Sequence, residues 1–494
     1  MPRTTSRYDV IVVGAGNAAL TAALSASQAG ARVLVLEKAP EAERGGNSRF
    51  SGGLFRFAYD GIEELKPFRR DLSAADWDRV EAGHYDTDRY YQDIMRVTQG
   101  QADRQLSLKL TGESYSTLAW MTGLGVDWDW TSLWSVDSGE LLRFNPGAVL
   151  EARNKGVGLM ESLYRAVGLA SIDVVYGAKM TAFLQDGDGG VTGVRIRTPD
   201  GTEDAPAGAV VLASGGFEAN AEMRARYLGP GWDQVKVRGT KFNTGETLRM
   251  ALELGAKPVG HWQGCHATPV DGDSAPVGDL RLTDRTNRLS YPYSIMVNVL
   301  GRRFIDEGED TGGYTYAKTG RAVLAQPGAM AYQIFDAKTV HLLEERYSTG
   351  APVVSETIEG LAGGLSIPAD ALAQTVAEYN AAVLPGRFDP AVKDGKGTAG
   401  LEPPKSNWAL LLDTPPYTAY SVACGITFTY GGIQIDTQAR VIDTEDNPVP
   451  GLYATGEITG GFFFHNYPGG TGLMRGAVFG RIAGANAAAE GAGK

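Results

Sequence analysis

The stretch "YDVIVVGAGNAALTAALSASQAGARVLVLEK", residues 8–38, carries the strongest local signal for the fold of this chain. It opens with a short β-rich, mostly apolar run, which is typical of a buried parallel strand. Small residues predict a helix over 17–29, and a second apolar strand over 32–36 leads to Glu37. Gly14 and Gly16 give the pattern G-x-G-x-x-A, with the acid 23 residues after the first glycine. The stretch therefore predicts a strand–helix–strand unit that binds a dinucleotide.

The two glycines have a physical reason at these positions. Gly14 permits a tight turn, and Gly16 lets backbone N–H groups approach a pyrophosphate at the helix N-terminus. Glu37 can accept hydrogen bonds from an adenosine ribose. A more literal match, "GKGTAG" at 395–400, lies in a charged, proline-rich loop with no strand before it and no helix after it. We therefore do not interpret that match as a nucleotide site.

The next segment, "EKAPEAERGGNSRFSGG" at 37–53, favours FAD over NAD. An NAD-binding domain would normally enter another helix at this point. A glycine-rich loop that carries Asn47 and Ser48 suits a longer cofactor, whose ribityl chain and isoalloxazine continue beyond the dinucleotide site. A plain surface loop stays open as the alternative interpretation.

The bulk composition limits the function classes. A chain of 494 residues should form two or three cores. The net charge of −12 argues against a general nucleic-acid or membrane-surface role. Cys265 and Cys424 are too few for a disulfide framework or a cysteine-rich metal site, so we expect no metal. Without a long apolar run or a signal-peptide pattern, we expect a cytoplasmic protein that does not span a membrane.

The residue composition and the predicted pattern of strands and turns change twice along the chain. A β-meander over 173–217 returns to a buried strand that ends at "LASGGF", a chain reversal able to lie against a cofactor. Aromatic, arginine-containing loops and an amphipathic helix over 369–384 then replace the glycine-rich strand-and-turn rhythm. We therefore predict an FAD-binding domain over 1–261, a capping and substrate domain over 262–425, and the resumed FAD-binding domain over 426–494.

Six motifs together resemble the fumarate reductase and succinate dehydrogenase flavoprotein superfamily. They are "VIVVGAGNAAL", "EK" with "GGNSRFSGG", "VVLASGGF", "GRRFIDE", "TYGGIQIDT" and "GLYATGE". The resemblance implies an α/β fold: a Rossmann-like FAD-binding domain of the glutathione-reductase type, interrupted by a smaller α+β cap. Because "GGNSRFSGG" lacks the histidine that some relatives use for covalent attachment, it also implies non-covalent FAD.

The motifs and the resemblance together predict the cofactor-binding residues. These are Gly14, Ala15, Gly16, Asn17, Ala18, Glu37, Lys38, Gly45, Asn47, Ser48, Gly52, Gly53, Ala178, Ala213, Ser214, Gly215, Gly456, Glu457, Gly472 and Leu473.

Within the superfamily, "GHWQGCHA", "YTYAKTGRAVLAQPG", "CGITFTYGG" and "HNYPGGTGL" look closest to tricarballylate dehydrogenases, and "NYPGG" also resembles the ketosteroid dehydrogenase branch. The match to fumarate reductases fails at three positions. Tyr316 stands where they have a proton-donating arginine, Thr427 where they have a substrate histidine, and Tyr467 where they have a substrate arginine. His266 matches a histidine that binds a substrate carboxylate. Fumarate is therefore not the expected substrate.

We expect His266 to be the first carboxylate ligand and His465 the second. Tyr316 is the predicted proton-transfer group, with Arg321 or Lys318 lowering its pKa or acting in its place. Catalysis also involves Tyr467 in this prediction, and Thr427 contacts the substrate.

Three arginines in "RLTDRTNR", Arg281, Arg285 and Arg288, could line the cleft and attract an anionic substrate. A solvated loop in which they pair with nearby aspartates is the alternative. Of the three, Arg288 is our predicted substrate-binding residue.

The leading hypothesis is an FAD-dependent oxidoreductase acting on CH–CH groups. It would oxidise tricarballylate to cis-aconitate by hydride transfer to flavin N5 and proton removal by a cap residue. The alternatives are a desaturase of a cyclic ketone or keto-acid, and a non-catalytic flavin redox module. A basic cleft would favour the tricarboxylate, whereas an apolar cleft with two tyrosines would favour the ketone. Electrons would leave to an iron–sulfur membrane protein, a quinone or O₂.

Overall fold

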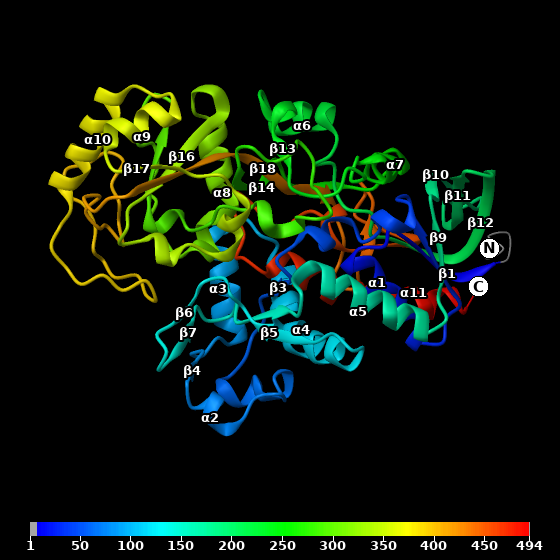
Figure 1. Ribbon diagram of the computed structural model, residues 1–494. Coiled ribbons are helices and arrows are strands. Elements are labelled where there is room, and N and C mark those ends of the chain that lie inside the picture. Colours follow the sequence, from blue (N-terminus) through cyan, green and yellow to red (C-terminus); the bar gives the residue numbers. More distant parts are fainter. Residues whose placement is uncertain (1–6, 494) are drawn as a thin grey trace.

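The computed structural model describes residues 7–493 and contains two large sheets (Figure 1). The predicted strand–helix–strand unit is present as β1 (Tyr8–Val13), α1 (Asn17–Gln28) and β2 (Val33–Glu37). β1 is wholly interior and pairs in parallel with β2 on one side and with β12 (Gly201–Leu212) on the other. This burial on both sides explains why β1 and β2 are near-continuous apolar runs.

These strands belong to an eight-stranded sheet built from three separate parts of the chain, residues 8–37, 173–212 and 440–454. Its main path is β10 (Lys179–Gln185), β11 (Val191–Thr198), β12, β1, β2 and β9 (Asp173–Tyr176). β20 (Pro448–Ala454) pairs in parallel with β12 and carries β19 (Arg440–Ile442) at its other edge. The late strand β20 therefore completes the sheet that β1 begins, as expected for a cofactor domain that resumes.

The C-terminal helix α11 (Thr471–Gly491) packs closely against α1. Glycine makes this approach possible, because a Cβ added to Gly484 would lie 2.1 Å from the carbonyl oxygen of Ala22. Both helices carry mostly small residues, so their backbones come together beside the sheet. The N-terminus of α11 is thereby placed near the N-terminus of α1, and Asn17 Nδ2 donates to the carbonyl of Leu473.

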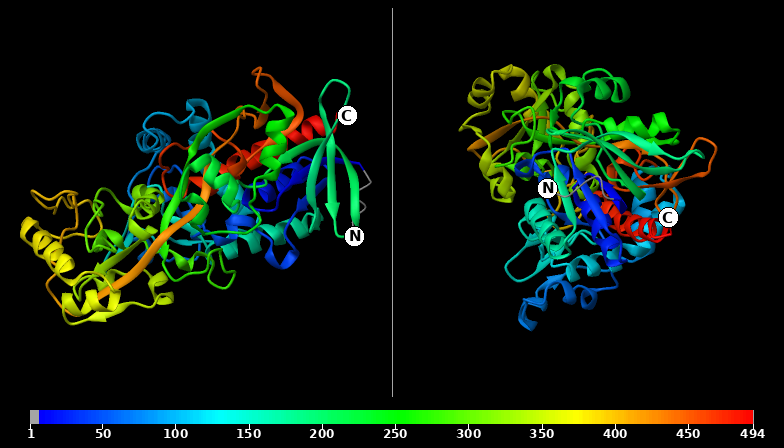
Figure 2. Two further views of the ribbon diagram at one scale, coloured as in Figure 1. Left: turned by 90° about the horizontal axis from the view of Figure 1, so that it is seen from above. Right: turned by 90° about the vertical axis from the view of Figure 1, so that its right-hand side faces the viewer.

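The second sheet has six strands and surrounds the long strand β18 (Tyr417–Ile433). Three strands pair with β18 in antiparallel: β14 (Pro258–Asp271), β16 (Met330–Phe335) and β17 (Val353–Ser355). One strand, β13 (Lys236–Val237), pairs with β18 in parallel, and β15 (Ile295–Asn298) pairs with β16. Figure 2 shows β18 running from the end of the molecule that carries α9 (Ile358–Leu365) and α10 (Ala369–Ala382) toward the first sheet. α8 (Gly312–Leu324) packs against β14.

The remaining elements lie outside the two large sheets. The longer helices are α3 (Thr87–Val97), α4 (Arg104–Gly123) and α5 (Lys155–Leu169), and the shorter ones are α2 (Ala74–Trp77), α6 (Ala221–Leu228) and α7 (Glu246–Leu254). Two small sheets hold β3 (Leu54–Phe55), β5 (Trp128–Trp130) and β8 (Leu150–Ala152), and β4 (Val80–Glu81), β6 (Ser135–Asp137) and β7 (Leu142–Phe144).

The predicted α/β class is confirmed, and the predicted amphipathic helix is α10. The boundaries of the three predicted domains stay a prediction; the second sheet also takes in β13 and the last residues of β18, beyond 262–425. Within residues 7–493, no helix combines the length and the apolar character needed to cross a bilayer.

Candidate active site

A cavity of about 920 Å³ opens at the carboxyl ends of β1, β2 and β12. Fourteen of the predicted cofactor residues line it: Gly14, Ala15, Gly16, Asn17, Ala18, Glu37, Lys38, Asn47, Ser48, Ala178, Ala213, Ser214, Gly215 and Glu457. This edge is where parallel α/β sheets bind their ligands, because the loops and helix N-termini there face outward from the strands.

The first glycine of the motif cannot be replaced by a larger residue. Gly14 has φ +111°, and an added Cβ would lie 2.4 Å from the carbonyl oxygen of Ala213. Gly16 has no side chain to cap α1, no acid lies in the first turn, and the N–H of Asn17 donates to Ser48 Oγ at 3.0 Å. A helix N-terminus without an acid and with small residues around it fits a pyrophosphate. Glu37, at the end of β2, is only 7% exposed and fits the ribose of the same cofactor.

A second cavity, of about 900 Å³, adjoins the first. The two cavities share Asn17, Ala18, Asn47, Ser48 and Glu457, so together they form a long space that suits FAD rather than a shorter nucleotide. Four further predicted cofactor residues line the second cavity: Gly52, Gly456, Gly472 and Leu473.

Gly45 and Gly53 line neither cavity. Gly45 has φ +108° at the turn before residues 46–50, and Gly53 has φ +67° with Lys155 backbone atoms 2.7 Å from an added Cβ. Both positions require glycine for the path of the main chain. Their predicted contact with the cofactor therefore has no support from this geometry.

Aromatic side chains form the far side of the second cavity. Tyr316 comes from α8, Tyr467 from the loop before α11 and His266 from β14. The hydroxyl groups of Tyr316 and Tyr467 are hydrogen-bonded to each other. The ring centroid of His266 is 4.8 Å from that of Tyr316 and 5.2 Å from that of Tyr467. The structure thus brings together three predicted residues, of which His266 and Tyr467 are 201 positions apart in the sequence.

Burial fixes the protonation states of these three groups. It raises the pKa of both tyrosines, and the neighbouring Tyr467 raises the pKa of Tyr316 further. It also lowers the pKa of His266 well below its ordinary value, with Arg238 acting in the same direction. Among residues 7–493, neither ring nitrogen of His266 has a hydrogen-bond partner. The cavity therefore presents two neutral phenols and a neutral imidazole that can still bond to a ligand.

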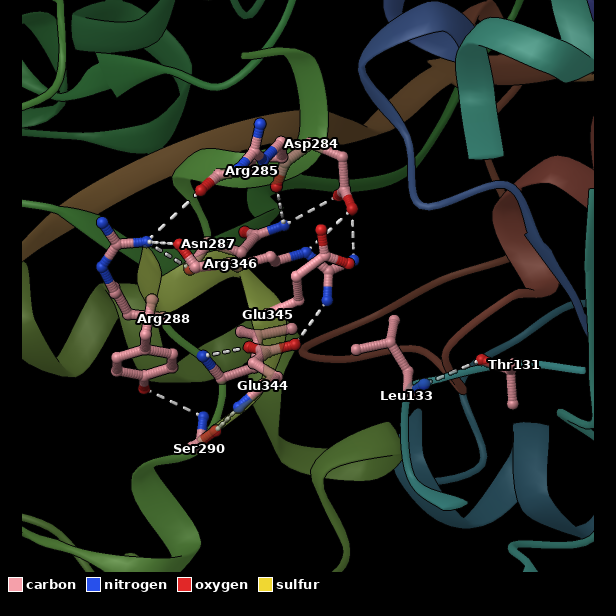
Figure 3. Close-up of polar contacts among 12 residues, drawn as sticks. Thr131, Leu133, Asp284, Arg285, Asn287, Arg288, Ser290, Glu344, Glu345 and Arg346 are labelled. Atoms are coloured by element: carbon pink, nitrogen blue, oxygen red, sulfur yellow. Dashed lines mark hydrogen bonds and ion pairs between the residues drawn. The ribbon is translucent and has the colours of Figure 1, made fainter. Parts of the chain in front are cut away.

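Buried charged side chains line another side of this cavity and form a charged wall, of which Figure 3 shows Asp284, Arg346 and Glu344. Asp284 accepts from Arg238 at 2.7 Å and from Nε of Arg346 at 2.8 Å, and Arg346 also pairs with Glu344. Burial alone would raise the pKa of Asp284, but the two guanidinium groups outweigh it and hold the pKa at about 2. Arg238 also donates to Thr427 Oγ1 at 3.1 Å, so the predicted substrate residue Thr427 does line the cavity.

Arg475, in α11, was not predicted as a site residue. It is 2% exposed, lines the second cavity and lies 4.8 Å over the ring of Phe463. Burial lowers its pKa to about 10. The signal in the sequence was an arginine inside a run of small and apolar residues, "GLMRGAVFG". Arg238, Asp284, Arg346 and Trp134 were also missed, and no local pattern marks them.

Two predicted residues of α8 lie away from the cavity. Lys318 pairs with Glu309 at 2.7 Å, and Arg321 donates to the carbonyl of Gln263. Positions two and five residues after Tyr316 fall on different faces of a helix. Burial raises the pKa of Tyr316, and the guanidinium groups that oppose this shift are those of Arg238 and Arg56. The expectation that Lys318 or Arg321 lowers that pKa is therefore wrong.

His465 and Arg288 are also outside the cavity lining. His465 is exposed with φ +61°; its Nε2 is 3.0 Å from Gln101 Nε2, and its backbone N–H donates to His261 Nδ1. Its ring lies beside that of His261, with the two centroids 4.7 Å apart. Arg288 is completely buried and pairs with Asp271 at 2.8 Å.

Arg281 fits the alternative interpretation, in which the arginines of this segment lie in a solvated loop and pair with nearby aspartates. It is exposed and pairs with Asp279. Within residues 7–493, no three His, Cys, Asp or Glu side chains are placed to hold a metal ion together.

The sequence and the fold are similar to those of known proteins along nearly the whole chain. Residues 9–473 match the family described as FAD binding domain. A probable fumarate reductase of Shewanella frigidimarina is 31% identical over 497 residues, covering 97% of this chain and 74% of that protein. A 4-oxocyclohexanecarboxylate 2-dehydrogenase of Sinomonas cyclohexanicum is 29% identical over 566 residues, covering 100% of this chain and 94% of that protein. The open conformation of a flavocytochrome c3 fumarate reductase has a TM-score of 0.75 at 27% identity, covering 99% of this chain and 79% of that one.

Proposed function

The chain belongs to the FAD-binding-domain family and is an FAD-dependent oxidoreductase, and on that premise we propose that it oxidises a C–C bond beside the ketone of a small cyclic keto-acid. The observation that carries the proposal is the contact between the hydroxyl groups of Tyr316 and Tyr467 inside the second cavity. Phenol hydroxyls in a buried, aromatic cavity suit a carbonyl oxygen, which is a neutral acceptor.

When bound, FAD would supply the two-electron acceptor for a hydride from the C–C bond that is oxidised. This hydride leaves the carbon that is one bond further from the ketone. The residues of the chain supply the rest. Tyr467 donates to the ketone oxygen, and Tyr316 donates to Tyr467, so the pair stabilises negative charge that develops on that oxygen. Both hydroxyls keep their protons because burial raises their pKa.

The proton on the carbon next to the ketone needs an acceptor. The raised pKa of Tyr316 makes it a donor, so we move the predicted role of proton acceptor from Tyr316 to His266, the other cap residue of the cluster. Burial keeps His266 unprotonated near neutral pH, and its ring nitrogens have no other partner among the described residues. Positioned general bases contribute about 10²–10⁴-fold to a rate and work best when their pKa lies near the operating pH. The lowered pKa of His266 makes it a weak base, so its contribution lies at the low end of that range.

The charged wall favours a substrate with one carboxylate. Arg238 and Arg346 are balanced by Asp284 and Glu344, so the wall carries little surplus positive charge. Nε of Arg238 has no partner within residues 7–493 and offers one N–H to an anion. The relative from Sinomonas cyclohexanicum, whose name specifies a cyclic keto-acid, supports the same substrate class.

Oxidation of tricarballylate to cis-aconitate is the second candidate. His266 and the free edge of Arg238 favour it, because both can bind carboxylates in the cavity that also holds Thr427. The charge of the cavity argues against it. A trianion needs several positive charges around it, whereas the cavity offers only Arg475 and the small surplus positive charge of the charged wall.

We also propose that electrons leave to a separate acceptor, such as an iron–sulfur membrane protein, a quinone or O₂, and that the protein works in the cytoplasm. Two buried cysteines offer no cluster of thiolate ligands for a second redox centre of its own.

Steady-state assays with an artificial electron-accepting dye test the proposal. Holoenzyme should turn over 4-oxocyclohexanecarboxylate and leave succinate untouched. Turnover of tricarballylate without turnover of the keto-acid would establish the second candidate instead. Turnover of neither would refute both.

A further inference from the structure

The second cavity is separated from an outer groove by a thin wall of three side chains. The groove has a volume of about 670 Å³ and is lined by Tyr293, Glu344 and Trp408, among others. Leu133, Trp134 and Leu289 line both the cavity and the groove. Leu133 and Trp134 come from the loop between β5 and β6, and Leu289 comes from the segment before β15. The two spaces therefore meet at these three side chains.

Trp134 is the largest part of this wall and is held in an unusual conformation. Its φ is +58°, a left-handed backbone that a tryptophan adopts only when its surroundings enforce it. Its indole Nε1 is buried and has no hydrogen-bond partner among residues 7–493. A structural tryptophan normally finds a partner for this group when it is buried.

Glycines on both sides make room for the indole. A Cβ added to Gly469 would lie 2.5 Å from the Trp134 ring, and one added to Gly312 would lie 2.4 Å from its Nε1. The ring also packs on Tyr316, with centroids 5.2 Å apart and planes at 57°. Trp134 is thus wedged between the loop that carries Tyr467 and the helix that carries Tyr316, at the edge of the reacting site.

Leu133 is held beside it. Its backbone N–H donates to Thr131 Oγ1 at 3.0 Å, and Figure 3 shows these two residues on one side and the Asp284–Arg346 group on the other. On the cap side, the backbone N–H of Leu289 donates to Glu344 at 2.8 Å. Both flanks of the wall are therefore fixed by hydrogen bonds, and the indole closes the space between them.

We propose that Trp134 determines substrate specificity by setting the length of the substrate cavity. Its indole blocks the cavity from the groove, so the site accepts acids about one ring long and rejects those that would extend past Leu133 and Leu289. This inference rests on the proposed function for the identity of the reacting end, but it concerns only the size of what the cavity holds. Removal of the indole joins cavity and groove into one longer site.

Binding of two unreactive aromatic acids to the holoenzyme tests the proposal. The short probe is para-hydroxybenzoate, and the long probe is the corresponding hydroxybiphenyl carboxylic acid. Each Kd is measured from the change in flavin absorbance on titration. Wild type should prefer the short probe, and Trp134→Ala should shift the ratio of affinities toward the long probe by about tenfold or more, as expected when a steric block is removed.

Two further variants keep the test decisive. Leu289→Ala opens the same wall from the cap side and should shift the ratio in the same direction, even if Trp134→Ala does not fold. Trp77→Ala is the matched control, because Trp77 packs on Trp130 at 5.4 Å and lines neither space. It should leave the ratio unchanged.

Equal affinities in wild type, no binding of the short probe to wild type, or an unchanged ratio in both wall variants would each overturn the proposal. The proposed function fails separately. A keto-acid that is never oxidised, together with the expected shift in the binding ratio, refutes the reaction and leaves the role of Trp134 standing.

Discussion

Replacement of Asp284 by asparagine should destabilise the protein more than almost any other single polar substitution. Asp284 is 2% exposed and serves as the shared partner of Arg238 and Arg346. Asparagine keeps the shape and removes the charge. Two buried guanidinium groups then lose their common counter-ion, and only Arg346 retains another carboxylate, that of Glu344.

The size of the effect follows from this arrangement. Breaking a buried ion pair by removing one partner costs about 3–5 kcal/mol, because the remaining charge stays buried. The pKa gives a second figure: a fall from 3.8 to about 2 corresponds to about 2 kcal/mol of stabilisation by the charged form. Since the folded pKa lies below the unfolded one, this contribution is present above pH 3.8 and is lost as the pH falls through about 2.

Urea unfolding of the holoenzyme, followed by circular dichroism at neutral pH and at decreasing pH, measures both quantities. Asp284→Asn should lower the unfolding free energy by about 3–5 kcal/mol and flatten its dependence on pH in the acid range. The control is Asp279→Asn, five residues earlier, whose partner Arg281 is exposed; it should have little effect. A loss no larger in Asp284→Asn than in the control would refute the account of the charged wall.

Three further predictions concern the cofactor and the reaction. Tyr467→Phe should keep its FAD and lose about 10²–10³-fold in kcat/KM, since it removes the donor to the ketone oxygen; steady-state assays check this, and a loss below about threefold would contradict the role. Gly14→Val should lose FAD, because its Cβ would lie 2.4 Å from the carbonyl oxygen of Ala213; the ratio of flavin to protein absorbance after desalting measures this, and full retention would be inconsistent with the cradle. Arg321→Ala should stay within about twofold of wild-type kcat/KM, because Arg321 lies on another face of α8, and a tenfold loss would restore its predicted catalytic role.

The cofactor half of the molecule could be predicted from sequence because its signals are local. The turn at Gly14, the helix after Gly16 and the acid at Glu37 lie within 24 residues, and each follows from backbone geometry or from the contact expected with a dinucleotide. The helix of residues 369–382 was likewise visible from its own periodicity.

The substrate half depends on contacts between distant segments. The resemblance to known flavoproteins identified His266, Tyr316 and Tyr467, but nothing local links Arg238 to Asp284 or Trp134 to Gly469. Proximity in sequence was misleading as well, since His465 is two residues from Tyr467 but does not line the cavity. The face on which Arg321 lies could have been read from helical spacing alone.

Anaerobic mixing of the holoenzyme with 4-oxocyclohexanecarboxylate tests the central claim most directly. We predict that the yellow colour of the oxidised flavin bleaches in a single turnover and that the product is the ketone with a double bond beside its carbonyl. Tyr467→Phe should slow this step while retaining its FAD. A flavin that stays oxidised with the keto-acid, or that bleaches equally fast in Tyr467→Phe, would contradict the claim that the Tyr316–Tyr467 pair activates a ketone.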